Sequence, residues 1–149
     1  MITAQPYTTK NQGLVRAGTP LADPVLAAEA RSVIDRCNDA AARSGLLQIA
    51  TPMETCAAGD YLGEWRGIVD DARSRTLVTV SSLQAIDYVG DVFTTTDGGV
   101  VQVTIERWYV QTREQGFVSA PELQIVPQVY ILRRISGRLL ITENYQWQQ

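Results

Sequence analysis

The sequence predicts an α+β domain in which N-terminal helices pack on a curved, four-stranded antiparallel sheet, giving a cone-shaped molecule. Apolar residues recur at helical spacing between residues 24 and 75. After Arg75 the pattern changes to strand-like alternation, and the strand-like segments are separated by short turns that contain glycine. Helices followed by hairpin-linked strands are typical of α+β domains.

The first helix is predicted to begin at Asp23-Pro24, since Asp is a favourable N-cap and Pro is tolerated at the first helical position. We expect Ser44-Gly45 to end it, with the glycine at positive φ. Its apolar face is formed by Leu26, Ala30, Val33, Cys37 and Ala41.

Two further helical segments follow. Thr51-Pro52-Met53-Glu54 matches a capping box, which predicts a short helix to about Ala58. Gly59 stops this segment, and Asp60 is expected to cap another helix. The apolar stripe of that helix comprises Leu62, Trp65, Val69 and Ala72.

Four strands are expected in the C-terminal half. The first has a bulge or bend near Ser81-Ser82, and Thr96-Asp97-Gly98-Gly99 is a hairpin turn, because Asp-Gly and Gly-Gly readily adopt positive φ. Pro127 indicates an edge or a bulge in the third strand. The strands are expected at 76–93, 100–113, 124–134 and 139–147.

The chain is expected to hold one domain, over residues 21–149, preceded by a flexible tail or linker over residues 1–20. That tail contains Pro6, Gly13, Gly18 and Pro20 and lacks apolar periodicity. A length of 149 residues agrees with one domain. No stretch approaches the roughly 20 apolar residues needed to span a bilayer. Both a cytoplasmic protein and the soluble part of an anchored protein fit these features.

Composition excludes several classes of function. The chain has no histidine, so imidazole is excluded as base or metal ligand. Its net charge is -3, Lys10 is the only lysine, and the arginines are scattered, which disfavours nucleic-acid binding. Cys37 and Cys56 fit small buried apolar residues, and a single bridge between two packed helices is the alternative. We expect no cofactor and no metal site.

The order and spacing of these elements resemble a known superfamily. Gly59-Asp60-Tyr61-Leu62-x-x-Trp65, the strands at 76–93 and 100–113, and the closing Gly137-Arg138-Leu139-Leu140-Ile141-Thr142-Glu143 look like the nuclear transport factor 2-like (cystatin-like) superfamily. Within it, the chain is most similar to the intermembrane-space-type domain of chloroplast-division proteins and their cyanobacterial relatives. The resemblance covers residues 24–147 and implies a cone fold. The superfamily includes both enzymes and non-catalytic assembly domains, so the resemblance does not decide the function.

An enzyme with this fold and no histidine needs carboxylates or tyrosines as acid–base groups. Glu143 shares parity with Leu139 and Ile141, which allows it to point inward; the ordinary alternative is an ion pair with Arg107 or Arg133. The catalytic set of such an enzyme would comprise Asp87, Glu143, Tyr109 and Arg107, with Asp91, Glu106, Tyr61 and Tyr88 as further candidates.

A binding domain would use other residues. Trp108 lies opposite the row Val101-Val103-Ile105, on the same face of its strand as Glu106. If that face is exposed, Trp108 anchors a partner. Trp147 is expected to pack across a dimer or onto the sheet. The candidate binding residues are Trp108, Glu106, Tyr130 and Trp147.

These features favour a non-catalytic binding or assembly domain that acts through the sheet face or the mouth of the cone. We expect a homo-oligomer, such as a homodimer, with a protein partner or self-association. The alternative is a small cone-fold isomerase, cyclase or hydrolase that acts on an apolar small molecule through carboxylate and tyrosine. An enzyme should show a carboxylate hydrogen-bonded to a tyrosine beside an open cavity, and a binding module a filled cone with Trp108 exposed.

Overall fold

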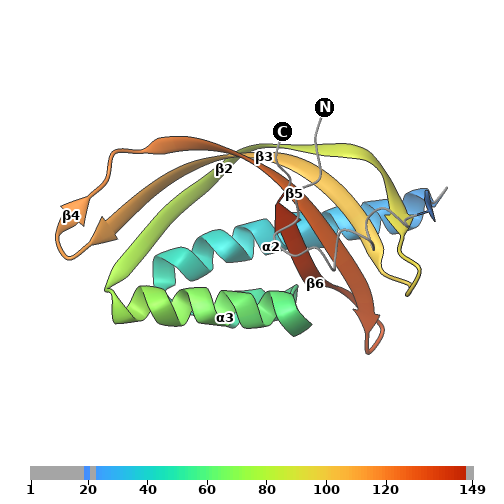
Figure 1. The fold of residues 1–149 in the computed structure, drawn as a ribbon, viewed down its shortest axis with the longest axis horizontal. Helices are drawn as coiled ribbons and strands as arrows, with labels where there is room; N and C mark the ends of the chain where they lie inside the picture. Colours follow the sequence, from blue (N-terminus) through green and yellow to red (C-terminus); the bar gives the residue numbers. More distant parts are fainter. Residues whose placement is uncertain (1–18, 21–22, 147–149) are drawn as a thin grey trace.

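The computed structural model describes residues 19–20 and 23–146 and confirms the predicted α+β architecture. A curved antiparallel sheet arches over two long helices, which lie side by side on its concave side (Figure 1). The strand order is β1-β2-β3-β5-β6, with β4 paired to β3. The elements are β1 (Thr19–Pro20), α2 (Pro24–Leu47), the 3-10 helix η1 (Thr51–Thr55), α3 (Gly59–Ser74), β2 (Leu77–Thr94), β3 (Val100–Glu114), β4 (Phe117–Val118), β5 (Glu122–Ile135) and β6 (Arg138–Gln146).

The four long strands match the four predicted ones, and the sheet gains two short strands. Thr19–Pro20, expected within a flexible tail, pairs with the end of β2 as β1. Residues 1–18 of that predicted tail lie outside the described residues. Phe117–Val118 pairs with the end of β3 as β4.

Helix α2 begins as predicted and ends later than predicted. Asp23 is its N-cap, with Oδ1 accepting a 3.0 Å hydrogen bond from the Leu26 N–H. The helix continues through Ser44-Gly45 to Leu47, where Gln48 adopts the left-handed conformation instead. Gly45 allows β2 to approach α2 closely, because a Cβ there would lie 3.1 Å from the Thr79 carbonyl oxygen of β2. The absent side chain lets β2 lie against the end of α2.

The predicted capping box is wrong. Thr51 lies inside the 3-10 helix η1, whose N-cap is Ala50, and no side chain caps that end. Asp60 likewise lies within the first turn of α3, where the N-cap is Ala58. A negative charge at that position still interacts favourably with the helix dipole.

The register of the sheet decides which side chains face the helices. Glu106 and Trp108 of β3 face the concave side together with Tyr130 of β5. The row Val101-Val103-Ile105 therefore lies on the convex side, where Val101 packs with Val129 and Ile131 in a small second core. The assumption that Trp108 is exposed is wrong, because the helices cover its side of the sheet.

A β-bulge near the start of β6 changes the face on which Glu143 lies. Leu132 pairs with Ile141 and Ile131 pairs with Glu143, so Thr142 is an extra residue. The Thr142 hydroxyl donates to the Ile131 carbonyl oxygen at 3.3 Å. Glu143 thus turns to the convex side, away from the face of Leu139 and Ile141 that simple alternation assigns to it. Bulges in β2, after Leu83 and after Val89, lie beyond the predicted Ser81-Ser82.

Pro127 occupies β5 without breaking the sheet. It pairs with Ile105 of β3, whereas pairing with β6 begins at the next residue, Gln128. The position of Pro127, beyond the last described pair of β5 with β6, agrees with the edge or bulge that the sequence indicates.

The main core lies between α2, η1 and one end of the sheet, and a disulfide joins two of these parts. Cys37 of α2 and Cys56, which follows η1, are fully buried and bonded to each other, with a Cα–Cα distance of 5.5 Å. The interpretation of both cysteines as unlinked apolar residues is wrong, and the alternative of one bridge is right. Met53 and Ile34 are fully buried in the same core.

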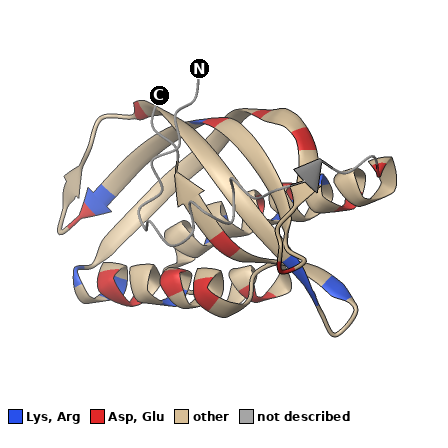
Figure 2. Ribbon diagram, turned by 45° about the vertical axis from the view of Figure 1, so that its right-hand side comes forward, with Lys and Arg blue, Asp and Glu red and all other residues tan. Residues whose placement is uncertain are grey.

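Charged positions occur on the helices, on the strands and at the turns (Figure 2). Acidic residues recur along α3, at Asp60, Glu64, Asp70 and Asp71. Within 19–20 and 23–146, no helix is long and apolar enough to cross a membrane, and no three Asp, Glu or Cys residues cluster to hold a metal ion.

Candidate functional site

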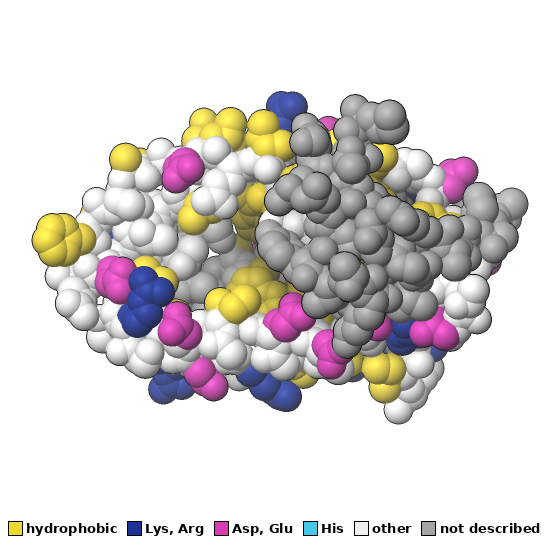
Figure 3. Space-filling model, in the orientation of Figure 1, with side chains coloured by type: hydrophobic (Ala, Val, Ile, Leu, Met, Phe, Trp, Pro, Cys, Tyr) yellow, Lys and Arg dark blue, Asp and Glu magenta, His cyan; other side chains and the backbone are white. Residues whose placement is uncertain are grey.

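A pocket of about 490 Å³ lies between α2, α3 and the concave face of the sheet. In the space-filling view a hollow with hydrophobic side chains in its wall opens between the sheet and α3 (Figure 3). Its volume falls within the range of small-molecule sites. The residues that line it are Asn38, Ala41, Ser44, Gly45, Tyr61, Glu64, Trp65, Ile68, Val69, Asp71, Ala72, Leu77, Thr79, Ser81, Trp108, Val110, Gln124, Val126, Gln128, Tyr130, Asn144 and Gln146.

Aromatic side chains form facing walls of this pocket. Tyr61 and Trp65 come from successive turns of α3, and Trp108 and Tyr130 come from the sheet. Of the stripe predicted for α3, Trp65, Val69 and Ala72 line one wall, whereas Leu62 packs against the main core. The even-numbered residues of β3 and β5 supply the other.

Glu106 lies beneath the pocket and is completely buried. Its carboxylate accepts hydrogen bonds from the Thr104 hydroxyl at 2.7 Å, the Trp108 indole N–H at 2.9 Å and the Tyr130 hydroxyl at 2.6 Å. Three donors compensate the loss of hydration that burial imposes on a carboxylate. Glu106 is therefore held by the sheet itself and is not among the residues that line the pocket.

Burial keeps the nearby phenols protonated. The pKa of Tyr130 is raised well above its ordinary value, chiefly by burial and then by the negative charge of Glu106. The pKa of Tyr61 is also raised by burial, although its hydrogen bond with Trp65 acts in the opposite direction. Neither phenol is a proton acceptor near neutral pH.

Two buried polar side chains of α2 carry atoms without a hydrogen-bond partner. The Tyr130 oxygen lies 3.1 Å from Asn38 Oδ1, but Asn38 Nδ2 has no partner within the described part of the chain. Ser44 Oγ also lacks one. Asn38 is 4% exposed and Ser44 is 0% exposed, and both line the pocket. Buried polar atoms are rarely left unpaired, so these two indicate a missing hydrogen-bonding group.

Among the residues that the structure describes, no positive charge lines the pocket. None of these lining residues is Lys or Arg, whereas Glu64 and Asp71 are carboxylates. Asp71 forms an ion pair with Arg75 at 3.4 Å. The pKa of Glu64 is raised, first by burial and second by the charge of Asp60. An anionic ligand is therefore disfavoured on electrostatic grounds.

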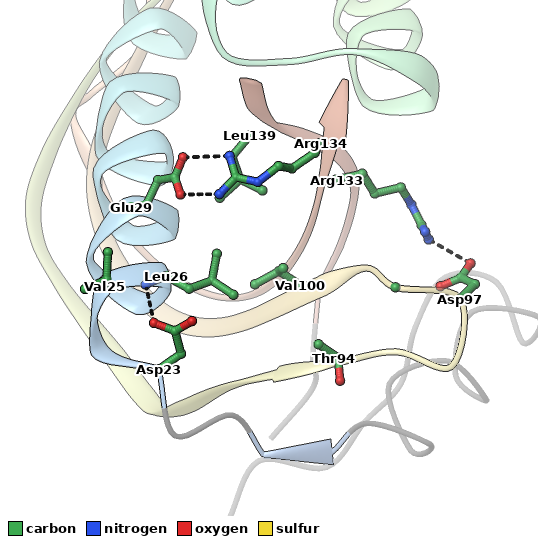
Figure 4. A pocket seen from close by; sticks show the side chains of 11 residues that line it. Asp23, Val25, Leu26, Glu29, Thr94, Asp97, Val100, Arg133, Arg134 and Leu139 are labelled. Atoms are coloured by element: carbon green, nitrogen blue, oxygen red, sulfur yellow. Dashed lines mark hydrogen bonds and ion pairs between the residues drawn. The ribbon is translucent and has the colours of Figure 1, made fainter. Parts of the chain in front are cut away.

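A second, open pocket of about 630 Å³ lies beside the start of α2. Its charged groups are already paired: Arg134 binds Glu29 through two hydrogen bonds, Arg133 binds Asp97 at 3.0 Å, and Asp23 caps α2 (Figure 4). These pairs leave fewer groups for a ligand than the concave pocket does. We therefore take the concave pocket as the candidate site.

The structure does not bring the candidate catalytic residues together. Asp87, Arg107 and Tyr109 lie on strands β2 and β3 with exposed side chains. Glu143 is bound by Arg133 at 3.3 Å and accepts from Tyr145 at 2.5 Å, so the ordinary alternative of an ion pair with Arg133 is right. Asp91 is exposed, and the Tyr88 hydroxyl donates to Asp35 of α2.

Three of the four candidate binding residues do come together, as the linked set Trp108, Glu106 and Tyr130. Trp108 and Tyr130 line the pocket, and Glu106 holds both from beneath, so the set is not an exposed anchor. Trp147 lies outside the described residues. Asn38 and Ser44 were missed, although polar residues among the small residues of an apolar helix face are a signal that could have identified them.

The comparisons with known proteins bear on the fold. No protein-family model matches the sequence, and a search of curated proteins finds no match. Among solved structures, the fold is similar to the crystal structure of the intermembrane space region of chloroplast protein ARC6. The TM-score is 0.75 at 13% identity, over 87% of this chain and 100% of that chain. At this identity the likeness shows the fold alone, and it confirms the predicted resemblance at that level.

Proposed function

We propose that this protein is a non-catalytic binding domain that holds an apolar ligand group in its concave pocket, at the mouth of the cone. The supporting observation is the pocket of about 490 Å³, walled by aromatic side chains of α3 and the sheet. Open apolar pockets with a few polar groups are typical of binding sites.

The state of the buried carboxylate argues against proton transfer. Glu106 accepts three hydrogen bonds and does not line the pocket, and the phenols of Tyr61 and Tyr130 stay protonated. A general base must reach the proton that it abstracts. Glu106 does so only if Tyr130 or Trp108 moves aside.

The cone-fold enzyme is the second candidate function, because a carboxylate hydrogen-bonded to a tyrosine does lie beside an open pocket, as expected above of an enzyme. Among the described residues, the filled cone expected of a binding module is not found. In such an enzyme Tyr130 would contact the bound molecule, and its hydrogen bond to the Glu106 carboxylate would set the acidity of its phenol. Tyr130→Phe would then abolish turnover without weakening binding, whereas the binding function predicts no turnover in either protein.

We further propose a homo-oligomer that associates through the convex face of the sheet. Leu123 and Ile125 are 49% and 56% exposed there, and their neighbour Tyr109 is 47% exposed. Contiguous exposed apolar side chains of this kind mark interaction sites. Membership of the nuclear transport factor 2-like superfamily is also our proposal, resting on the order of elements and the cone shape.

Two matched variants separate the pocket from the convex face. Ile68 of the pocket is 55% exposed and Ile125 of the convex face is 56% exposed, so changing each to Asp alters equally accessible positions. Fluorescence titration with the neutral apolar dye N-phenyl-1-naphthylamine reports pocket binding, and light scattering reports mass.

Ile68→Asp should weaken dye binding about tenfold or more, since a charge replaces an apolar wall, and should leave the mass unchanged. Ile125→Asp should lower the mass and leave dye binding unchanged. Dye binding that is absent in the unmodified protein, or equal in Ile68→Asp, would rule out the pocket function. A monomeric unmodified protein would rule out the homo-oligomer.

A further inference from the structure

The partners of Tyr130 determine the orientation of the Asn38 amide. A phenol carries one proton, and the 2.6 Å contact with the Glu106 carboxylate takes it. The 3.1 Å contact between Tyr130 and Asn38 is then a hydrogen bond only if Asn38 donates. Because amide oxygen and nitrogen are assigned from their partners, we place the NH₂ group toward Tyr130.

This orientation gives the unpartnered position to the Asn38 carbonyl oxygen. The wall of the pocket then contains a buried acceptor without a donor, and the unpartnered hydroxyl of Ser44 lies about 9 Å further along α2. Both atoms are covered, so a ligand reaches either one only when a neighbouring side chain shifts. Both residues lie on α2, so the missing donor belongs at the helix side of the pocket.

The other polar and aromatic groups of the pocket also favour a ligand that donates hydrogen bonds. Glu64 adds a carboxylate, no Lys or Arg of the described part of the chain lines the pocket, and aromatic rings such as those of Trp65 and Trp108 attract positive charge. Acceptors, carboxylates and aromatic rings all favour a ligand that donates hydrogen bonds or carries positive charge.

We propose that the pocket binds a small apolar molecule bearing a hydroxyl or amino group, which donates to Asn38 or to Ser44 of α2 while the apolar body lies between α3 and the sheet. This inference rests on the proposed binding function and specifies the chemical class of its ligand. A carboxylate at the same end of the molecule would face Asn38 oxygen and Glu64 without a counter-charge.

A series of naphthalenes with one varied substituent tests this directly. The probes are 2-(hydroxymethyl)naphthalene, 2-(aminomethyl)naphthalene, 2-ethylnaphthalene and 2-naphthoate, with affinities measured by displacement of N-phenyl-1-naphthylamine. The ethyl compound matches the size of the first two and lacks their donor. Hydroxymethyl and aminomethyl should bind about tenfold more tightly than ethyl, because a buried group regains its partner, and naphthoate should bind most weakly.

Substitutions test which residues cause the preference for a probe that donates a hydrogen bond. Ser44→Ala and Asn38→Leu should each reduce the advantage of hydroxymethyl over ethyl, and Ser44→Ala keeps the test valid should Asn38→Leu fail to fold. Glu64→Gln should weaken the aminomethyl probe roughly two- to fivefold and leave the hydroxymethyl probe unchanged. Asp39→Asn, an exposed change on the same helix, is the control and should alter neither.

The outcomes distinguish the two proposals. If no naphthalene displaces the dye, the pocket function itself fails. If ethyl, hydroxymethyl and aminomethyl bind equally, or naphthoate binds best, the pocket function stands and the donor-bearing ligand is wrong. Equal discrimination in Ser44→Ala, Asn38→Leu and the unmodified protein would also overturn the assignment to α2.

Discussion

The Tyr130 side chain reaches along the sheet to Glu106 although the two residues are not paired. In the register of β3 and β5, Tyr130 pairs with Gln102, and Glu106 pairs with Val126. The phenol thus spans four positions of β3 to donate its 2.6 Å hydrogen bond. This long reach lets one buried carboxylate fix the side chains of two strands.

Tyr130→Phe should lower the free energy of unfolding by about 1 to 3 kcal/mol, since it removes one of three donors to a buried charge. Urea denaturation followed by circular dichroism measures it. Thr112→Val, on the same strand with a partly exposed side chain, is a suitable control. A loss below about 0.5 kcal/mol would mean that Glu106 is satisfied without the phenol.

The hairpin between β2 and β3 should lose stability at low pH. The pKa of Asp97 is lowered from 3.8 to about 2 by its hydrogen bond from Thr95 and, second, by Arg133. Because the folded-state pKa is depressed, its contribution is present above pH 4 and is lost as the pH falls from about 4 to 2. The stability difference between the unmodified protein and Asp97→Asn should be constant above pH 5, shrink as the pH falls toward 2 and vanish only below that value. A difference independent of pH would contradict this.

The bridge between α2 and the segment after η1 should stabilise the fold. It joins cysteines 19 residues apart, and the loop-entropy model gives about 3 kcal/mol for closing such a loop. Reduction, or the double change Cys37→Ala and Cys56→Ala, should lower the free energy of unfolding by that amount, measured by urea denaturation. Thiol titration of the unreduced, denatured protein should find none free; two free thiols would show that the bridge does not form.

Two glycines in helices should respond differently to alanine. Nothing lies within 4 Å of a Cβ at Gly67 of α3, so Gly67→Ala should raise stability by about 1 kcal/mol through helix propensity alone. At Gly45 of α2 the new methyl group would lie 3.1 Å from the Thr79 carbonyl oxygen, which offsets that gain. Equal stabilisation by both changes would show that β2 yields easily at this contact.

Local sequence signals predicted the elements well because they depend on nearby residues. Asp23-Pro24 marks the start of α2, and Thr96 to Gly99 marks the turn between β2 and β3. The end of α2 was misjudged because the role of Gly45 depends on Thr79, which is distant in sequence. No local pattern reports such a contact.

The candidate site was harder to predict because it depends on which face of each strand meets the helices. Alternation correctly grouped Trp108 with Glu106, but it puts the apolar row Val101-Val103-Ile105 on the opposite face, and the structure turns the more polar face of β3 toward the helices. The bulge at Thr142 also reverses the alternation for Glu143. The set Glu106, Trp108 and Tyr130 was named from sequence, whereas its burial and mutual hydrogen bonds follow from tertiary packing.

The extra residue at Thr142 determines which chemical groups β6 presents to the pocket. Beyond the bulge, Asn144 and Gln146 line the pocket, while Glu143 and Tyr145 contact each other on the convex side of the sheet. A straight β6 of identical sequence would exchange these pairs, placing an acid and a phenol in the cavity and two neutral amides outside. The register of β6, not its composition, thus determines whether the strand gives the cavity two amides, which suit binding, or an acid and a phenol, which could transfer protons.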